Sequence, residues 1–182
     1  MKLTYETDRL ILKILSDEYT EKILEFLESN KDFFQSFEPI KSSEYYTFNY
    51  QESIIKNEYL SALGFRYIRF YVFEKKDPNK IIGTVSLSNI LPFPYSSSIV
   101  GYKFDPDFHG YGYATEALTK TIDFAFKEIK LHRIQAFILS ENLSSLRLIE
   151  RLGFNYEGTD LKAIDVNGKW MDHLRYSLIN YA

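Results

Sequence analysis

Short runs rich in apolar and β-branched residues recur along the chain and predict β-strands of ordinary length. They are separated by polar turns or by longer segments with a different periodicity, which suits a sheet built from several strands. We expect about seven strands, at residues 10–15, 67–73, 81–87, 98–104, 133–139, 154–163 and 170–179.

Longer segments carry apolar residues three and four apart, the spacing of one helix face. Ile23, Leu24, Phe26 and Leu27 form such a stripe after Ser16-Asp17, which offers an N-cap. The aromatic segment 32–39 is broken by a proline and predicts a short helix or a loop. Further helices are predicted at the following places: residues 44–63, residues 113–128, and from the cap Asn142 to the stop at Gly153.

Turn residues connect these elements and indicate how the strands pair. Asp77-Pro78-Asn79 predicts a turn, and Asn167-Gly168 is a strong hairpin signal. Gly83 lies inside a strand pattern and indicates a bulge or a close approach of another group. The strands at 67–73, 81–87 and 98–104 should form an antiparallel meander. The order of elements predicts a single domain over residues 1–182, with a mixed α+β sheet and helices on its faces.

Composition narrows the class of protein. With 182 residues, 45% hydrophobic and 26% charged, the chain can bury a core without disulfides, and it contains no Cys. The net charge of −3 argues against nucleic acid, whose phosphates need a basic face. No run approaches the roughly 20 apolar residues of a membrane span, and the start lacks a signal peptide. We therefore expect a cytoplasmic protein without a membrane partner. The three His show no ligand spacing, so no metal is expected.

The segment 106–114, Pro-Asp-Phe-His-Gly-Tyr-Gly-Tyr-Ala, joins a predicted strand to a helix N-terminus. Gly110 and Gly112 allow a tight turn that aims several backbone N–H groups at one point. Those groups and the helix dipole favour an anion, phosphate above all. A plain glycine turn before a surface helix is the competing interpretation. A Walker A loop would need Gly-Lys-Ser/Thr, and a Rossmann fingerprint would need three glycines after a first strand; neither pattern is present.

At this segment the chain resembles a known family. His109-x-x-Gly112-x-Ala114 is similar to the acetyl-CoA signature of the GNAT acetyltransferases, in which Gln or Arg is followed by two residues, Gly, one residue, and Gly or Ala. The resemblance extends to the RimJ/RimL branch, which acetylates N-terminal α-amines of ribosomal proteins. Its further matches are residues 7–12, residues 112–117, Asn142 to Ser145, residues 150–154 and residues 170–173. His109 stands where Gln or Arg is usual, so we expect the neighbouring backbone, more than this side chain, to hold the diphosphate.

The resemblance implies a GNAT fold whose sheet is splayed in the middle, with the pantetheine arm of CoA between strands 98–104 and 133–139. The arm would pair with the exposed backbone edge of residues 100–104. The cofactor-binding residues that it implies are Val100, Tyr102, Phe104, His109, Gly110, Tyr111, Gly112, Tyr113, Ala114, Thr115, Asn142 and Ser145.

Acetyl transfer needs a neutral amine and a proton for the departing thiolate. In RimL-like enzymes the residue matching Ser145 is proposed as the acid; the local alternative makes Asn142 a helix cap and Ser145 a first-turn residue. Glu38 and Asp160 are candidate bases, and water-mediated deprotonation is equally open. Phe37 belongs to an aromatic group that is usually core, but the family analogue of its segment lines the acceptor groove. Phe37 is therefore a candidate floor of the substrate site.

The resemblance implies an acetyl-CoA-dependent N-acetyltransferase whose acceptor is the N-terminal α-amine of a protein, a ribosomal one first. Two alternatives remain open: an enzyme for a small amine such as a polyamine, an amino acid or an aminoglycoside, and a non-catalytic acyl-CoA-binding regulator. Family members are often dimers, so a homodimer is one expected arrangement.

Overall fold

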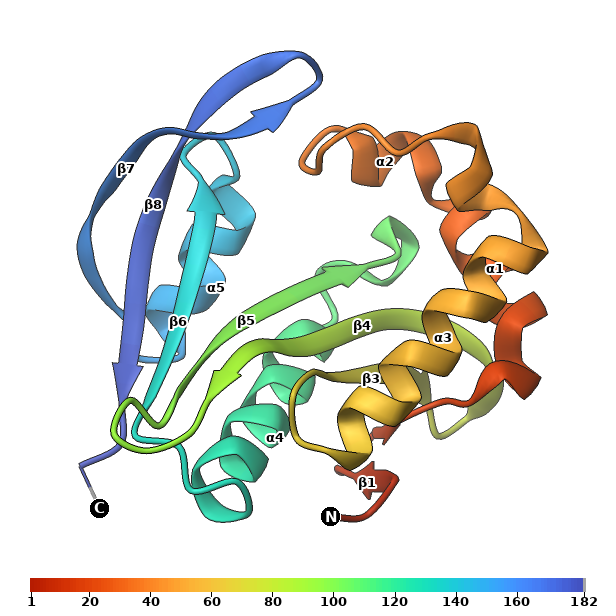
Figure 1. Ribbon diagram of the computed structural model, residues 1–182, viewed down its shortest axis with the longest axis horizontal. Helices are drawn as coiled ribbons and strands as arrows, with labels where there is room; N and C mark the ends of the chain where they lie inside the picture. Colours follow the sequence, from red (N-terminus) through yellow and green to blue (C-terminus); the bar gives the residue numbers. More distant parts are fainter. Residues whose placement is uncertain (182) are drawn as a thin grey trace.

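The computed structural model describes residues 1–181 and contains one sheet of eight strands flanked by helices (Figure 1). The strands are β1 (Thr4–Glu6), β2 (Leu10–Lys13), β3 (Ile68–Glu74), β4 (Asp77–Leu91), β5 (Ser97–Phe104), β6 (Arg133–Leu139), β7 (Asn155–Val166) and β8 (Lys169–Ile179). Their order across the sheet is β1-β2-β3-β4-β5-β6-β8-β7. All neighbours in this order pair antiparallel except β5 and β6, which pair parallel. The predicted α+β class and the antiparallel meander are confirmed.

The helices lie on both faces of the sheet. The α-helices are α1 (Thr20–Ser29), α2 (Lys31–Gln35), α3 (Phe48–Leu63), α4 (Tyr113–Lys127) and α5 (Leu143–Arg151). Three short 3-10 turns are η1 (Asp17–Tyr19), η2 (Ser43–Tyr46) and η3 (Pro106–Phe108). Figure 1 shows α1 and α3 over one face, with α4 behind β3 and β4 on the other.

Two apolar cores hold these layers together, and β3 contributes to both. Phe70 and Val72 belong to the core that includes α4, whereas Tyr71 and Phe73 belong to the core beneath α1 and α3. This division follows from the alternation of side chains along a strand. Burial of each large apolar side chain contributes about 1.5–3 kcal/mol, so the sheet is stabilised from both faces.

Three local predictions differ from the structure. The sheet has an eighth strand because β1, with one buried residue, Tyr5, pairs with β2. The turn expected at residues 77–79 was wrong: the turn lies at Lys75-Lys76, and Asp77 already pairs with Glu74 as β4 begins. The backbone of Asn79 does donate to the Asp77 carboxylate at 3.2 Å, a local bond typical of turns, but here it forms in the strand.

The helix expected over residues 44–63 is interrupted at Thr47, whose backbone is extended (φ −108°, ψ 150°). The Thr47 hydroxyl donates to the carbonyl of Glu44 at 2.7 Å and closes the short turn η2. The side chain of Thr47 thus competes with the helical hydrogen bond, and α3 begins at Phe48.

Candidate active site

A gap opens in the middle of the sheet because β5 and β6 diverge. Among the residues described, the two strands pair only where residues 97–99 of β5 lie beside residues 133–135 of β6. Beyond this point residues 100–104 pair with β4 alone, which leaves their other backbone edge open toward β6. A cavity of about 440 Å³ occupies the gap, lined by β5, β6, α5, the loop before α4 and the α2 region.

The cavity reaches both faces of the sheet. Val100, Tyr102 and Phe104 alternate along β5 with Gly101 and Lys103, and both sets line it. Since successive side chains of a strand point to opposite faces, two molecules can approach the gap from opposite sides.

Most of the residues selected from the sequence lie together around this cavity. Tyr111 and Asp160 are the exceptions. The residues that line it are Phe37, Glu38, Val100, Tyr102, Phe104, His109, Gly110, Gly112, Tyr113, Ala114, Thr115, Asn142 and Ser145.

Gly83 on β4 allows β5 to carry a large ring at this place. A Cβ at Gly83 would lie 2.3 Å from Cδ1 of Phe104, a distance that the two atoms cannot share. Both roles predicted for Gly83 are found, because the Phe104 ring approaches closely and the pairing of β4 with β3 shifts register between Gly83 and Ile81. The Phe104 ring therefore packs directly against Gly83 of β4 while it also lines the cavity.

The loop before α4 has the backbone of an anion-binding turn. Gly110 (φ 82°) and Gly112 (φ 80°) both adopt the left-handed conformation, which glycine adopts without steric cost. Gly112 is the N-cap of α4, so the unpaired N–H groups of the first helical turn begin here. These groups and the helix dipole fit a diphosphate without any Lys or Arg.

The side chain of His109 is engaged in holding this loop. Its Nε2 lies 3.1 Å from the carbonyl oxygen of Phe104, and its ring packs edge-on against Phe33. A carbonyl only accepts hydrogen bonds, so Nε2 carries the proton and donates it. His109 thus ties the loop to the end of β5.

The first turn of α5 presents Ser145 to the cavity. The side-chain oxygen of Asn142 accepts from the backbone N–H of Ser145 at 3.1 Å and from the Ser144 hydroxyl at 2.9 Å. The helix-cap role of Asn142 is therefore formed. Tyr102, from the facing strand, donates its hydroxyl to the carbonyl of Ser145 at 3.2 Å. Burial raises the pKa of Tyr102 to about 12, although hydrogen bonding with Ser145 acts in the opposite direction, so Tyr102 keeps its proton at neutral pH.

On the other face of the sheet, Glu38 and Lys103 form an ion pair at the cavity wall. Both carboxylate oxygens of Glu38 lie near Nζ of Lys103, at 3.1 and 3.2 Å. Burial lowers the pKa of Lys103, and the charge of Glu38 partly offsets this. The ion pair holds Glu38 at the cavity wall and leaves lone pairs of its carboxylate free to accept from another group.

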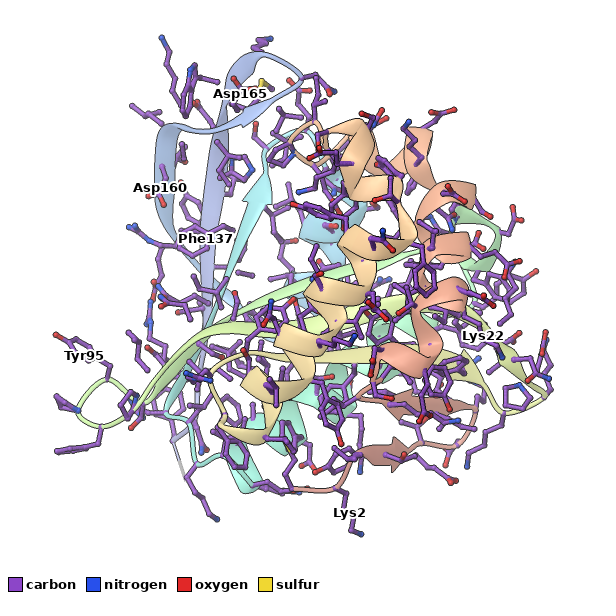
Figure 2. All side chains as sticks on the ribbon, turned by 45° about the vertical axis from the view of Figure 1, so that its right-hand side comes forward. Lys2, Lys22, Tyr95, Phe137, Asp160 and Asp165 are labelled. Carbon is purple, nitrogen blue, oxygen red and sulfur yellow. The ribbon has the colours of Figure 1, made fainter. Side chains whose placement is uncertain are left out.

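Asp160 does not join this group. It lies on β7, which β8 separates from β6 (Figure 2), and its carboxylate pairs with Arg175 at 2.9 Å. It is absent from the residues that line the cavity. Tyr111 also lies outside the cavity, where it stacks on Tyr113.

Lys103 is the residue that sequence reasoning missed. The strand at 98–104 was predicted, and Tyr102 and Phe104 were named among the expected cofactor-binding residues. Alternation along the strand places Lys103 on the face opposite to these two residues. A lysine between apolar residues of an inner strand is the signal that could have identified it, but its partner Glu38 is 65 positions away.

Residues 9–155 match the family model described as an acetyltransferase (GNAT) domain. The chain belongs to the GNAT acetyltransferase family. It is therefore an acyltransferase whose acetyl donor is acetyl-CoA. No helix among residues 1–181 is long and apolar enough to cross a membrane, and His, Asp and Glu form no group of three there that could hold a metal ion.

Three known proteins are similar to this GNAT enzyme over most of its length. It is 36% identical over 168 residues to YjcK of Bacillus subtilis, described as a probable N-acetyltransferase, with 88% of each chain covered. It is 28% identical to the ribosomal protein uS5-alanine N-acetyltransferase of Escherichia coli, covering 97% of this chain and 91% of the other. The crystal structure of the ribosomal-protein-S5-alanine acetyltransferase of Vibrio fischeri superposes with a TM-score of 0.94 at 30% identity, covering 99% and 98%. The GNAT enzyme thus resembles the RimJ/RimL branch over nearly its whole length.

Proposed function

We propose that this GNAT enzyme acetylates the N-terminal α-amine of a protein in the cytoplasm, with a ribosomal protein as the first candidate. The observation that carries the proposal is the full-length similarity to uS5-alanine acetyltransferases in both sequence and structure. A cavity that opens to both faces of the sheet also supports it, because donor and acceptor could then meet directly in one complex.

We assign the donor to the face of the sheet that carries the loop before α4, residues 109–112, which we call the glycine loop. The backbone N–H groups of Gly110 to Thr115 would bind the diphosphate, and the open edge of residues 100–104 would pair with the pantetheine arm. Tyr102, Phe104 and Asn142 would contact the arm from either side. We assign the acceptor to the opposite face, where Phe37 and Glu38 line the cavity.

Acetyl-CoA supplies the activated acetyl group, and the residues of the chain manage the protons. An α-amine has an ordinary pKa of about 7.7–8.0, against about 10.4 for lysine, so a part of it is already neutral at cellular pH. The neutral nitrogen becomes cationic as it attacks, and it then loses one proton to water or to Glu38. As the bond from nitrogen to the acetyl carbon forms, the carbon–sulfur bond breaks and its electron pair stays on sulfur. The Ser145 hydroxyl donates a proton to that sulfur and regains one from water, so the serine ends neutral. Asp160 has no part in this scheme because it does not line the cavity.

A panel of amines tests the acceptor class. CoA release is measured with short peptides that begin with Ala, Ser or Met, with spermidine, and with an aminoglycoside. We expect turnover of at least one free peptide, and none of the same peptide with an acetylated N-terminus. Turnover of spermidine or the aminoglycoside without turnover of any peptide would contradict the proposal and favour a small amine.

Binding of CoA should stabilise the protein, because a ligand that binds only the native state shifts the folding equilibrium. At 100 times its Kd, CoA should add about 2.7 kcal/mol, which raises the Tm by about 5–10 °C for a chain of this size. Inorganic phosphate at the same concentration serves as a control and should give a far smaller shift. An unchanged Tm with saturating CoA would contradict the assigned donor site.

A further inference from the structure

The outer side of the glycine loop is held by Arg9, which lies 102 positions before Tyr111 in the turn between β1 and β2. Nη1 of Arg9 donates to the carbonyl of Tyr111 at 2.9 Å. Nε and Nη2 both reach Oε2 of Glu116 at 2.7 Å, and the backbone N–H of Arg9 donates to Oε1 at 2.9 Å. The guanidinium also lies over the ring of Tyr113, 4.7 Å from its centre. Arg9 therefore contacts both the loop and the first turn of α4.

The bond to Tyr111 controls the direction of the next N–H group. In a planar trans peptide the C=O and the following N–H point in opposite directions. Tyr111 lies outside the cavity, whereas Gly112 lines it. By holding the Tyr111 carbonyl on the outside, Arg9 turns the N–H of Gly112 away from itself and toward the cavity. A Cβ at Gly112 would lie 3.5 Å from Nη2 of Arg9, so the side chain follows the loop closely.

The charge of Arg9 is already matched by Glu116. This carboxylate lies in the first turn of α4 with only 17% of its side chain exposed. Burial alone would raise its pKa, but hydrogen bonds from Thr7 and Arg9 hold the pKa of Glu116 below its ordinary range. Glu116 is thus ionised at neutral pH, and the pair presents no net charge to the loop. The contribution of Arg9 is then mainly orientation of the backbone.

We propose that Arg9 is a positioning residue for CoA, because it holds the glycine loop from behind in the conformation that presents its N–H groups to the diphosphate. The inference rests on the proposed placement of the diphosphate at residues 110–115. Arg9 itself does not line the cavity. It acts through the backbone of Tyr111 and Gly112.

The test compares two ligands that differ in the diphosphate. The Kd of CoA and of pantetheine, which has the same thiol arm without the nucleotide diphosphate, is measured by titration calorimetry for the wild type, Arg9→Gln and Arg9→Lys. We expect Arg9→Gln to weaken CoA about tenfold, as for loss of one hydrogen bond from a charged donor. The Kd of pantetheine should change less than twofold. Arg9→Lys keeps the charge but loses the several N–H donors of the guanidinium group. Its Kd for CoA should lie between those of the wild type and Arg9→Gln, and this variant remains informative if Arg9→Gln does not fold.

A matched control removes an ion pair from the far end of the same helix. Asp123 and Lys127 on α4 form an exposed pair that does not contact the loop, so Asp123→Asn should leave both Kd values unchanged. Equal weakening of CoA and pantetheine by Arg9→Gln would overturn the inference and make Arg9 a general structural residue.

A double variant separates orientation from charge. If Arg9 only neutralised Glu116, adding Glu116→Gln to Arg9→Gln would restore the affinity for CoA, and the inference would be wrong. We expect CoA binding to stay at least fivefold weaker than in Glu116→Gln alone. Gly112→Ala, strained by its positive φ, tests the placement itself. If Gly112→Ala weakens CoA binding and Arg9→Gln does not, only the proposed role of Arg9 is wrong. If neither variant weakens CoA binding, the diphosphate site is elsewhere.

Discussion

Ser145→Ala is expected to lower kcat about 100-fold, the lower range for loss of a general acid, while the KM for acetyl-CoA stays within about twofold. The hydroxyl lies in the first turn of α5 at the cavity, where the departing sulfur would need its proton. In the proposed donor site many backbone groups hold acetyl-CoA, whereas the proton is needed only during the reaction. The measurement is steady-state CoA release with a saturating peptide acceptor.

Two neighbouring hydroxyl groups provide controls for this variant. Ser144→Ala removes a hydroxyl that donates to Asn142 and should change kcat by no more than a few fold. Tyr102→Phe removes the hydroxyl that donates to the Ser145 carbonyl. If Tyr102→Phe loses about 100-fold in kcat and Ser145→Ala remains within twofold of wild type, Tyr102 is the proton donor and the assignment of Ser145 is wrong.

Gly83→Ala is expected to destabilise the fold by about 3 kcal/mol, near the upper range for overpacking a core. The added methyl group would need the space of the Phe104 ring, 2.3 Å away, in the middle of a paired sheet. Thermal unfolding should show a Tm lower by about 6–12 °C. Because Phe104 also lines the cavity, the displaced ring should weaken CoA binding as well.

A smaller side chain at position 104 tests whether the clash with the ring causes the loss of stability in Gly83→Ala. Gly83→Ala combined with Phe104→Leu should recover part of the Tm relative to Gly83→Ala, since the clash with the ring is removed. Gly64→Ala is the matched control: its φ is −93° and the nearest neighbour is a flexible Arg66 side chain at 3.4 Å. It should change stability by less than about 1 kcal/mol. A Gly83→Ala protein as stable as Gly64→Ala would show that the sheet can move to accept the methyl group.

Local chemistry explains why much of the architecture could be predicted. The strand at 133–139 was predicted with its observed bounds because it is short, rich in apolar residues and bounded by polar residues. The hairpin at Asn167-Gly168 forms with positive φ at both residues, 55° and 78°, as its turn chemistry requires. Asn142 caps α5 with its own side chain. Each of these features depends on residues that are near one another in the sequence.

The observed elements differ from the predicted ones where contacts between distant residues decide the structure, and local sequence patterns do not contain these contacts. β1 is three residues long and becomes a strand because β2 pairs with it. The turn predicted at residues 77–79 lies two residues earlier because the register between β3 and β4 shifts near Phe73 and Glu74. Both are decided by the pairing partner across the sheet.

The sequence by itself determined the class of fold, the family, and the glycine loop and α5 start that face the cavity, since these depend on neighbouring residues and on spacing. Only the tertiary structure decided how the site is held. The Glu38–Lys103 pair, the bond from Arg9 to Tyr111 and the contact of Gly83 with Phe104 join separate elements. The same structure removed Asp160 from the site by pairing it with Arg175. Such contacts arise when distant segments pack together, and neither periodicity nor spacing along the chain encodes which side chains will meet.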